Sequence, residues 1–433
     1  MSLPYAMHQR FEAFRALRNR NFALLWVGLA TSGVGGQFYM IALPWLVLRL
    51  TGDPLAVGTV LAVGSVPRAA FMLFGGAVTD RLAPVRGLQW ANVTGMALLC
   101  ILAALVFTHS TELWAVYLIV LIAGLADGLF LPARYAVVPR LVSEESLQPA
   151  NALIMGTGQV CMAVGPALAG FLIAALAGHE VASTVAGDTP GTFGIGVAFA
   201  INAVALAVFS VCLWLIRTPR PETQSQQSQG ILSSALSGLG TIWQDRSVRM
   251  VMLLAATFNF FVSGPLWVGL PVLADTRFEG GAAAYGIVAS AMGAGMVAGS
   301  AVAAVTRPPR QTYLGPLVIA VIFIAGMCTV GLGFVETTAA GGACTAVMGL
   351  GFGYVDVVVF TWLQRRVAKE LVGRMMGFVM FAIVGMHPLS NTAAGIVLSF
   401  DTVGLFVGAG SALCILMAIY ALIPTVRSLG AEM

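Results

Sequence analysis

Four ionisable residues interrupt long apolar stretches of the sequence: Arg68, Asp127, Asp356 and His387. A charge at such a depth is costly, so ionisable groups there normally face a water-filled cavity or a partner. An aspartate whose arginine neighbour approaches and withdraws loads and releases a proton, and a histidine relays one. We therefore expect these four residues to include the groups that couple protons to the function of the protein.

Each of these residues also has a purely structural interpretation. Asp127 and Arg68 are alternatively a permanent ion pair, and Arg134, on the same helical face as Asp127, is a second candidate partner. Asp356 alternatively borders water at the membrane surface. His387, next to Pro388, is alternatively a hydrogen-bonded packing residue.

Neutral polar side chains also occur within the apolar stretches, where interhelical hydrogen bonds are their common role. They are Gln37, Tyr39, Asn92, Gln159, Asn202, Asn259 and Asn391.

Motifs of enzymes and ATPases do not occur in the sequence. A phosphate-binding loop needs G-x-x-x-x-G-K-[ST], and the lysine Lys369 lies in Ala-Lys-Glu-Leu instead. Neither H-E-x-x-H nor G-x-S-x-G occurs, and the six cysteines lack the spacing of a zinc site. We expect a protein that is not an enzyme, holds no cofactor or metal, and draws energy from an ion gradient or from the gradient of its own substrate.

The composition places these residues in a membrane. Of 433 residues, 59% are hydrophobic and 9% are charged, whereas a soluble domain carries about 25% charge. Stretches of roughly 20 apolar residues predict spanning helices, and we predict twelve, at 22–48, 55–78, 87–107, 112–133, 150–176, 193–216, 248–274, 284–306, 313–335, 339–363, 374–398 and 403–424. The expected surroundings are a lipid bilayer, and a net charge of +4 gives no reason to expect nucleic acid as a partner.

The basic residues predict the orientation. If both termini are cytoplasmic, the 22 Lys and Arg residues lie on the cytoplasmic side or at its border, except Arg49, Arg68 and Arg277. We therefore predict a multi-pass protein of the plasma (inner) membrane with both termini in the cytoplasm.

The chain divides into two related halves. A Pro-, Gln- and Ser-rich stretch at 217–247 is typical of a linker, and it separates an N-terminal six-helix bundle, 1–216, from a C-terminal one, 248–433. Ala42-Leu43-Pro44 in the first span matches Gly269-Leu270-Pro271 in the seventh. Such a parallel repeat is typical of alternating-access transporters with a site between the halves, and we expect the chain to act as a monomer.

Several motifs resemble those of the major facilitator superfamily. The loop between spans two and three carries a sequence similar to its signature G-x-x-x-D-R loop, at Gly76, Asp80, Arg81 and Arg86. The fifth span carries a sequence similar to the glycine-proline motif of antiporters, at Gly158, Gly165, Pro166 and Gly170. Asn21-Phe22, Ala42-Leu43-Pro44, Pro132-Ala133-Arg134 and Val138-Pro139-Arg140 resemble the macrolide-efflux and enterobactin-exporter branch.

The resemblance implies a fold and a function. It implies an all-α membrane protein of twelve helices that exports small amphipathic molecules, such as drugs or siderophores, by proton-coupled alternating access. It implies a latch between the bundles at the signature loop, and we group Arg134 with it. It also implies a cavity lined by spans one, four, seven and ten, where the candidates for substrate contact are Gln37, Phe38, Tyr39, Asn259, Phe261 and Trp267. The chain departs from the branch at Gln37 and Asn92, where acids are common.

Two further functions remain open at this stage. One keeps the fold and changes the cargo, as in a lipid or lysolipid flippase or an importer. The other is a polytopic membrane enzyme or sensor.

Overall fold

A computed structural model describes residues 17–81, 84–177, 192–216, 245–306, 309–366, 381 and 383–427. The predicted linker at 217–247 lies outside this part of the chain except for its last residues. Within it the secondary structure is helical, with no strand, as predicted.

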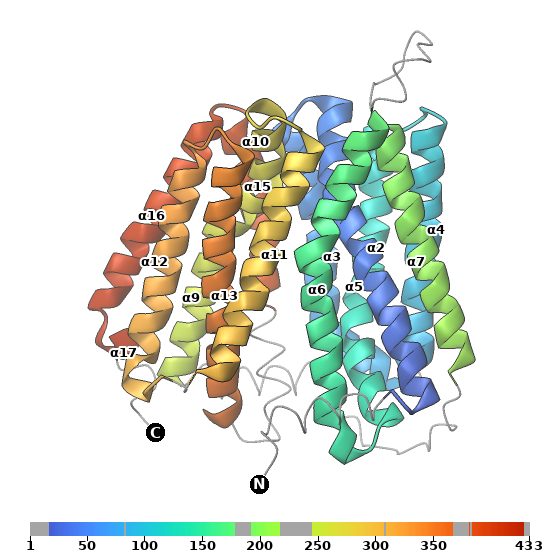
Figure 1. The fold of residues 1–433 in the computed structure, drawn as a ribbon, viewed down its shortest axis with the longest axis horizontal. Coiled ribbons are helices and arrows are strands. Elements are labelled where there is room, and N and C mark those ends of the chain that lie inside the picture. The colour runs from blue at the N-terminus through green and yellow to red at the C-terminus, as the bar shows by residue number, and fades with distance from the viewer. Residues whose placement is uncertain are drawn as a thin grey trace.

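Two groups of helices stand side by side (Figure 1). The first contains α2 (Arg20–Thr51), α3 (Pro54–Arg81), α4 (Pro84–Phe107), α5 (Leu113–Leu141), α6 (Glu144–Ala177) and α7 (Phe193–Leu215). The second contains α9 (Arg246–Gly264), a π-helical turn (Pro265–Gly269), α10 (Leu270–Thr276), α11 (Ala282–Val305), a 3₁₀ turn (Gln311–Tyr313), α12 (Leu314–Leu332), α13 (Thr338–Arg366), α15 (His387–Leu398), α16 (Thr402–Leu422) and α17 (Pro424–Arg427).

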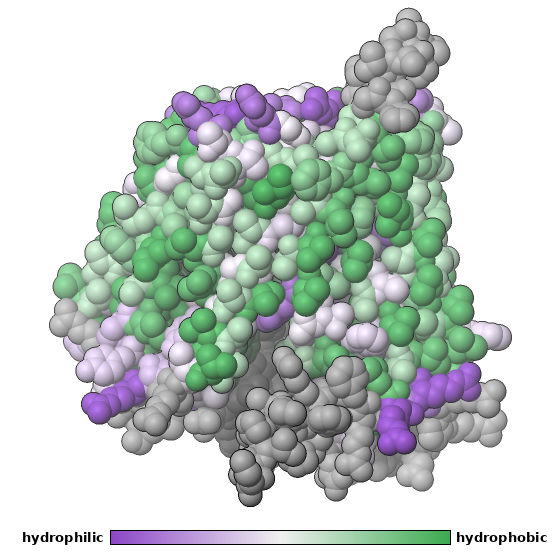
Figure 2. All heavy atoms as spheres, viewed as in Figure 1, coloured by the Kyte–Doolittle hydropathy of each residue, from purple (hydrophilic) through white to green (hydrophobic). Residues whose placement is uncertain are grey.

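The helices match the predicted spans in length and composition. Among the described residues, 9 helices are long and apolar enough to cross a membrane, and Pro54–Ala70 and Leu113–Gly128 are shorter apolar helices. Of the predicted span 374–398, the structure describes the second half, as α15. On the face of the molecule that Figure 2 shows, apolar side chains form a broad belt, and hydrophilic side chains gather at its two ends.

The first spanning helix is longer than predicted and runs through its proline. Asn19 caps α2 by accepting hydrogen bonds from the backbone N–H groups of Asn21 and Phe22. Pro44 lies inside the helix without ending it, and Gly52 ends it in the left-handed conformation, with φ of 63°.

The seventh span is interrupted by a side chain from another helix. The hydroxyl of Ser390 on α15 accepts from the N–H of Gly264 at 2.7 Å and donates to the carbonyl of Phe260 at 2.5 Å. These two backbone groups would bond each other in a regular α-helix, so Ser390 is inserted into the hydrogen-bond ladder of α9. The π-helical turn begins at the next residue, Pro265, which has no N–H to donate.

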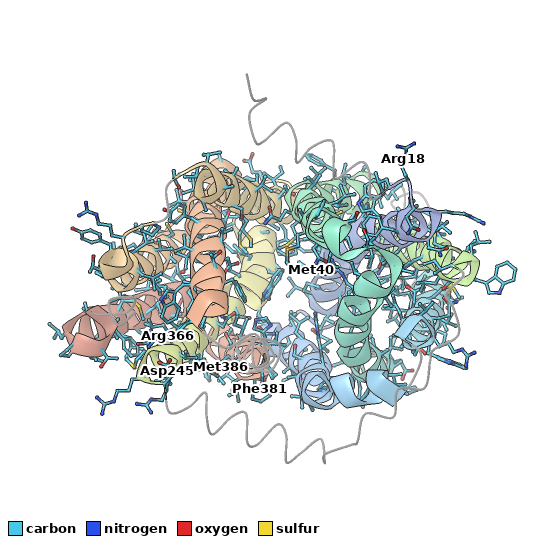
Figure 3. The ribbon with its side chains drawn as sticks, turned by 90° about the horizontal axis from the view of Figure 1, so that it is seen from below. Arg18, Met40, Asp245, Arg366, Phe381 and Met386 are labelled. Atoms are coloured by element: carbon cyan, nitrogen blue, oxygen red, sulfur yellow. The ribbon has the colours of Figure 1, made fainter. Side chains whose placement is uncertain are left out.

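An ion pair fixes the other end of α9, outside the span. Asp245 caps the helix through the N–H groups of Ser247 and Val248, and Arg366 at the end of α13 donates to it at 2.7 Å (Figure 3). Burial opposes ionisation of Asp245, but the hydrogen bonds from Arg366 and the helix N-terminus outweigh it and hold the pKa of this carboxyl below its ordinary value of 3.8.

Neutral polar side chains link neighbouring helices. Asn92 on α4 donates to the carbonyl of Leu206 at 2.7 Å and to the hydroxyl of Ser210 at 2.6 Å, both on α7. Gln159 on α6 donates to Ser300 on α11 at 3.2 Å, across the boundary between the two groups of helices. Interhelical bonding is therefore the role of these two residues.

Candidate functional site

The guanidinium of Arg68 lies at the meeting point of four helices. Its charge acts on Asp127 of α5, Tyr39 of α2 and His387 at the start of α15. Arg68 and Asp127 are exposed, although both belong to predicted spans. Because an ionisable group within a span normally faces a water-filled cavity or a partner, both are candidates for the lining of the predicted cavity between the two groups of helices.

Asp127 and Arg68 act on each other through space. Among the described residues the salt bridges are Arg49–Asp275 and Arg366–Asp245, and none joins Arg68 to Asp127. An arginine near an aspartate but not bound to it favours the charged carboxylate without locking it in place.

Arg134, the second candidate partner of Asp127, lies with it on α5. It lines a small cavity of about 60 Å³ together with residues of α2 and α6, among them Trp26, Thr157 and Gly158. That cavity lies within the N-terminal group of helices, so Arg134 reaches toward α2 and α6 there.

His387 contacts a predicted cavity residue of α9. Its Nε2 lies 3.3 Å from Oδ1 of Asn259. Because Nδ2 of Asn259 donates to the carbonyl of Ala255 at 2.9 Å, Oδ1 is the acceptor and His387 donates. This hydrogen bond joins two predicted site residues, one from each of two spans.

Asp356 lies on α13, in the C-terminal group, and is exposed to solvent. On the turn before it, Phe352 packs edge to face against Phe258 of α9, with ring centroids 4.5 Å apart. Asp356 therefore borders the cavity beside an aromatic pair.

The remaining predicted cavity residues divide between cavity and core. Tyr39, Phe261 and Trp267 are half-buried, and Tyr39 lies 6.2 Å from the ring of Phe199. Phe38 and Gln37 are buried to 7% and 9% exposure. They pack inside the protein here and do not line the water-accessible space.

The antiporter-like motif packs closely against two other helices. A methyl group built on Gly165 would lie 2.4 Å from Cγ of Gln37, and one built on Gly170 would lie 2.9 Å from the α-carbon of Gly286 on α11. A methyl group built on Gly286 would lie 2.4 Å from the carbonyl oxygen of Pro166. Gly158 has no such neighbour. The motif therefore joins the two groups of helices backbone to backbone.

The two groups also meet at the end of the molecule away from both chain termini, which we call the outer end (Figure 1). Arg49, near the end of α2, pairs with Asp275 of α10 at 2.9 Å and lies 5.0 Å from the ring centre of Trp45. A methyl group built on Gly58 of α3 would lie 2.4 Å from the carbonyl oxygen of Asn391 on α15. The two groups of helices are therefore in contact at the outer end.

Seen from that opposite end, the middle of the molecule lies between the two groups of helices (Figure 3). Met40 of α2 lies near this middle, whereas Met386, just before α15, lies closer to Asp245.

The side chains of the predicted latch residues Asp80 and Arg81 lie outside the described part of the chain, and so does the setting of Gly76, although α3 extends to Arg81. Arg86 is described and exposed on α4.

The outer ion pair was missed at the level of the sequence, although a signal for it existed. Arg49 and Arg277 are the basic residues at the acidic outer border. The structure pairs Arg49 with Asp275, and Arg277 donates to the carbonyl of Gly333 at 2.8 Å. The two basic residues at the outer border, which depart from the cytoplasmic bias of the other basic residues, therefore each make a specific contact.

Comparison with known proteins gives a consistent match over most of the chain. The family model described as Major Facilitator Superfamily matches residues 25–390. Macrolide efflux protein A of Streptococcus pyogenes is 21% identical over 381 residues, 87% of this chain and 88% of that protein. Multidrug efflux pump Tap of Mycolicibacterium fortuitum is 23% identical, over 86% of this chain and 88% of that protein.

Solved structures share the fold. A POT family transporter in complex with 5-aminolevulinic acid superposes with a TM-score of 0.71 at 11% identity, over 94% of this chain and 97% of its own. The nucleoside transporter NupG gives a TM-score of 0.66 at 13% identity, over 93% and 98%.

Proposed function

The chain belongs to the Major Facilitator Superfamily, and from this premise we propose that it exports small amphipathic molecules, such as drugs or siderophores, in exchange for protons. A transporter of this superfamily is a multi-pass membrane protein that moves small molecules and is not an enzyme. The relatives named as macrolide and multidrug efflux proteins support export as the direction. The bias of the basic residues supports a plasma-membrane protein with cytoplasmic termini and linker.

One observation carries the proton coupling: Arg68 interacts at once with residues of both bundles. Asp127 and Tyr39 belong to the N-terminal bundle, and His387 belongs to the C-terminal one. Arg68 and Asp127 move together with the N-terminal bundle. When the bundles rock against each other, His387 and the rest of the C-terminal bundle approach or leave them, which changes the electrostatic surroundings of Asp127. A carboxyl whose electrostatic surroundings change with conformation binds a proton in one state and releases it in the other.

Transport into proteoliposomes with an imposed pH gradient tests this proposal. Asp127→Asn keeps the shape of the side chain and removes the titration, so it should abolish pH-driven accumulation and retain downhill exchange. Glu336→Gln removes one acid from the exposed outer surface and should leave both activities unchanged. Intact pH-driven transport in Asp127→Asn would refute the carrier role.

The same variant separates coupling from structure. If Asp127 only balances Arg68, Asp127→Asn leaves an uncompensated charge inside the bundle and lowers the melting temperature. Melting in detergent is therefore measured beside transport, and a normal melting temperature with lost pH-driven transport supports the proposal.

The orientation has its own test. A membrane-impermeant thiol reagent added from outside should label a cysteine placed at Ala186 and leave one placed at Ser225 unlabelled. The reverse pattern would refute cytoplasmic termini.

A further inference from the structure

Asp356 lies on the face of α13 that carries Phe352. Gly349 and Gly353 face α11, where added methyl groups would each lie 2.1 Å from a carbonyl oxygen, and Gly351 faces α12. Phe352 faces α9, and Asp356 follows it by one helical turn on the same face. Because an exposed carboxylate within a span normally faces a water-filled cavity or a partner, we place this face toward the cavity expected between the bundles.

The carboxylate of Asp356 has no counter-charge in the described part of the chain. It lies about 15 Å along the helix from the end of α13 at Arg366 and is exposed. No hydrogen bond or ion pair of a described residue reaches it, and no basic group acts on it through space. Asp127, the acid on the opposite wall, has Arg68 nearby. Among the described residues, therefore, Asp356 has no basic group near it, whereas Asp127 has Arg68.

Two aromatic rings lie about one helical turn from this carboxylate. Phe258 and Phe352 are half-buried and meet at an interplanar angle of 74°. A cation placed over the face of an aromatic ring is attracted by it, and the apolar body attached to that cation gains contact area on the same rings. A carboxylate beside such a pair matches an organic cation.

A metal ion fits this place poorly. A hard cation needs about six oxygen ligands, and Asp356 supplies one carboxylate among hydrophobic neighbours. Within the described residues no group of three His, Cys, Asp or Glu side chains is positioned to hold a metal.

We propose that Asp356 and the Phe258–Phe352 pair form the binding site for the positively charged end of the cargo, an amine or onium group on an apolar body. This assignment takes Asp356 out of the predicted proton-coupling set and leaves proton transfer to the Arg68 cluster. It rests on the proposed export function, since it names the charge class of the exported molecule.

Two ions of the same shape and opposite charge test the inference. The binding of tetraphenylphosphonium and of tetraphenylborate is measured by equilibrium dialysis on the purified full-length protein in detergent, without a gradient. Wild type should prefer the phosphonium. Asp356→Asn should weaken phosphonium binding at least tenfold, about 1.4 kcal/mol, and leave borate binding no weaker.

Matched variants show which residues are responsible for the loss of phosphonium binding. Glu336→Gln makes the same charge change at the outer surface and should bind both ions as wild type does. Phe258→Leu should weaken phosphonium binding about two- to fivefold, and Asp356→Glu should retain most of the affinity. These last two variants keep the cavity charge, so they test the site even if Asp356→Asn does not fold.

Three results would overturn the inference. They are a folded Asp356→Asn that binds phosphonium as wild type does, an equal loss of both ions in that variant, and a wild type without preference for the phosphonium. Because dialysis needs no gradient, a protein that transports but shows no charge preference refutes this inference alone. A protein that binds phosphonium but shows no gradient-driven transport refutes the proposed function alone.

Discussion

The Arg49–Asp275 ion pair joins the two bundles only while their outer ends are together, so breaking it should favour opening of the outer end. Asp275→Asn removes the charge and nearly keeps the shape. The side chains are 42% and 31% exposed, so water and salt screen the pair, and a surface salt bridge contributes about 0.2–1 kcal/mol. With RT near 0.6 kcal/mol, the ratio of outer-open to outer-closed molecules should rise about 1.4- to 5-fold.

A second variant separates the two contacts of Arg49. Arg49→Gln loses both the ion pair and the contact with the Trp45 ring, which lies 5.0 Å from the guanidinium carbon. The ring contact lies within α2, between residues one helical turn apart, and is kept when the bundles separate, so Arg49→Gln should open the outer end about as often as Asp275→Asn. The exchange Arg49→Asp with Asp275→Arg restores opposite charges and should recover most of the closed population.

Spin-label distances measure this population. Ser110→Cys and Glu336→Cys place labels on exposed residues at the outer ends of the two bundles, in a protein whose native cysteines are replaced. The fraction at the longer distance is compared among wild type, the single variants and the charge exchange. An unchanged fraction in Asp275→Asn, or an exchange variant that stays as open as the single ones, would refute the role of the pair.

Three further outcomes are expected from other contacts. Gly58→Ala places a methyl group 2.4 Å from a carbonyl oxygen of α15 and should destabilise the outer-closed state by about 1–3 kcal/mol. The measurement is a lower melting temperature or a larger outer-open fraction. Gly36→Ala is the control, because its methyl group would have no atom within 4 Å, and it should change neither quantity. Arg366→Gln should lower the melting temperature at neutral pH, because the lowered pKa of Asp245 means that its ion pair stabilises the fold above the ordinary carboxyl pKa of 3.8. That stabilisation is lost as the pH falls through the lowered pKa, so the difference from wild type should shrink between about pH 5 and pH 2, and a constant difference would contradict the assignment. Ser390→Ala leaves backbone groups of α9 without their bridging hydroxyl and should cost about 1–3 kcal/mol, measured by thermal unfolding; an unchanged melting temperature would show that the ladder closes without it.

The spans were predictable because hydropathy and length alone define them. The prediction of the cavity wall was less complete, because it requires knowing how each helix is rotated about its axis and hence which face it turns toward the cavity. In a soluble helix the polar face gives that rotation, but lipid and protein interior are both apolar. Phe38 and Tyr39 are neighbours in sequence, and nothing in the pattern says that the first packs in the core and the second meets Arg68 through space.

Contacts between distant residues were beyond the sequence for another reason. Asn259 and His387 were each predicted as site residues, on spans seven and eleven, but their hydrogen bond depends on how α9 and α15 cross. That crossing is set in turn by Ser390 and Gly264, which carry no functional signature. Long-range geometry of this kind follows from packing and not from local composition.

Two helix crossings at the outer end are built from glycine, so main-chain atoms meet there, beside the side-chain ion pair of Arg49 and Asp275. Gly58 meets the backbone of α15, and Gly170 meets Gly286. The cavity is lined by side chains such as Asp356 and Phe258, which take no part in these crossings. Substitutions that change which cargo is bound therefore leave these glycine crossings unchanged. We expect selection for new cargoes to alter the residues of the cavity wall and to retain the glycines. A laboratory evolution experiment on a new drug should accumulate its changes accordingly, on the cavity faces of α9 and α13.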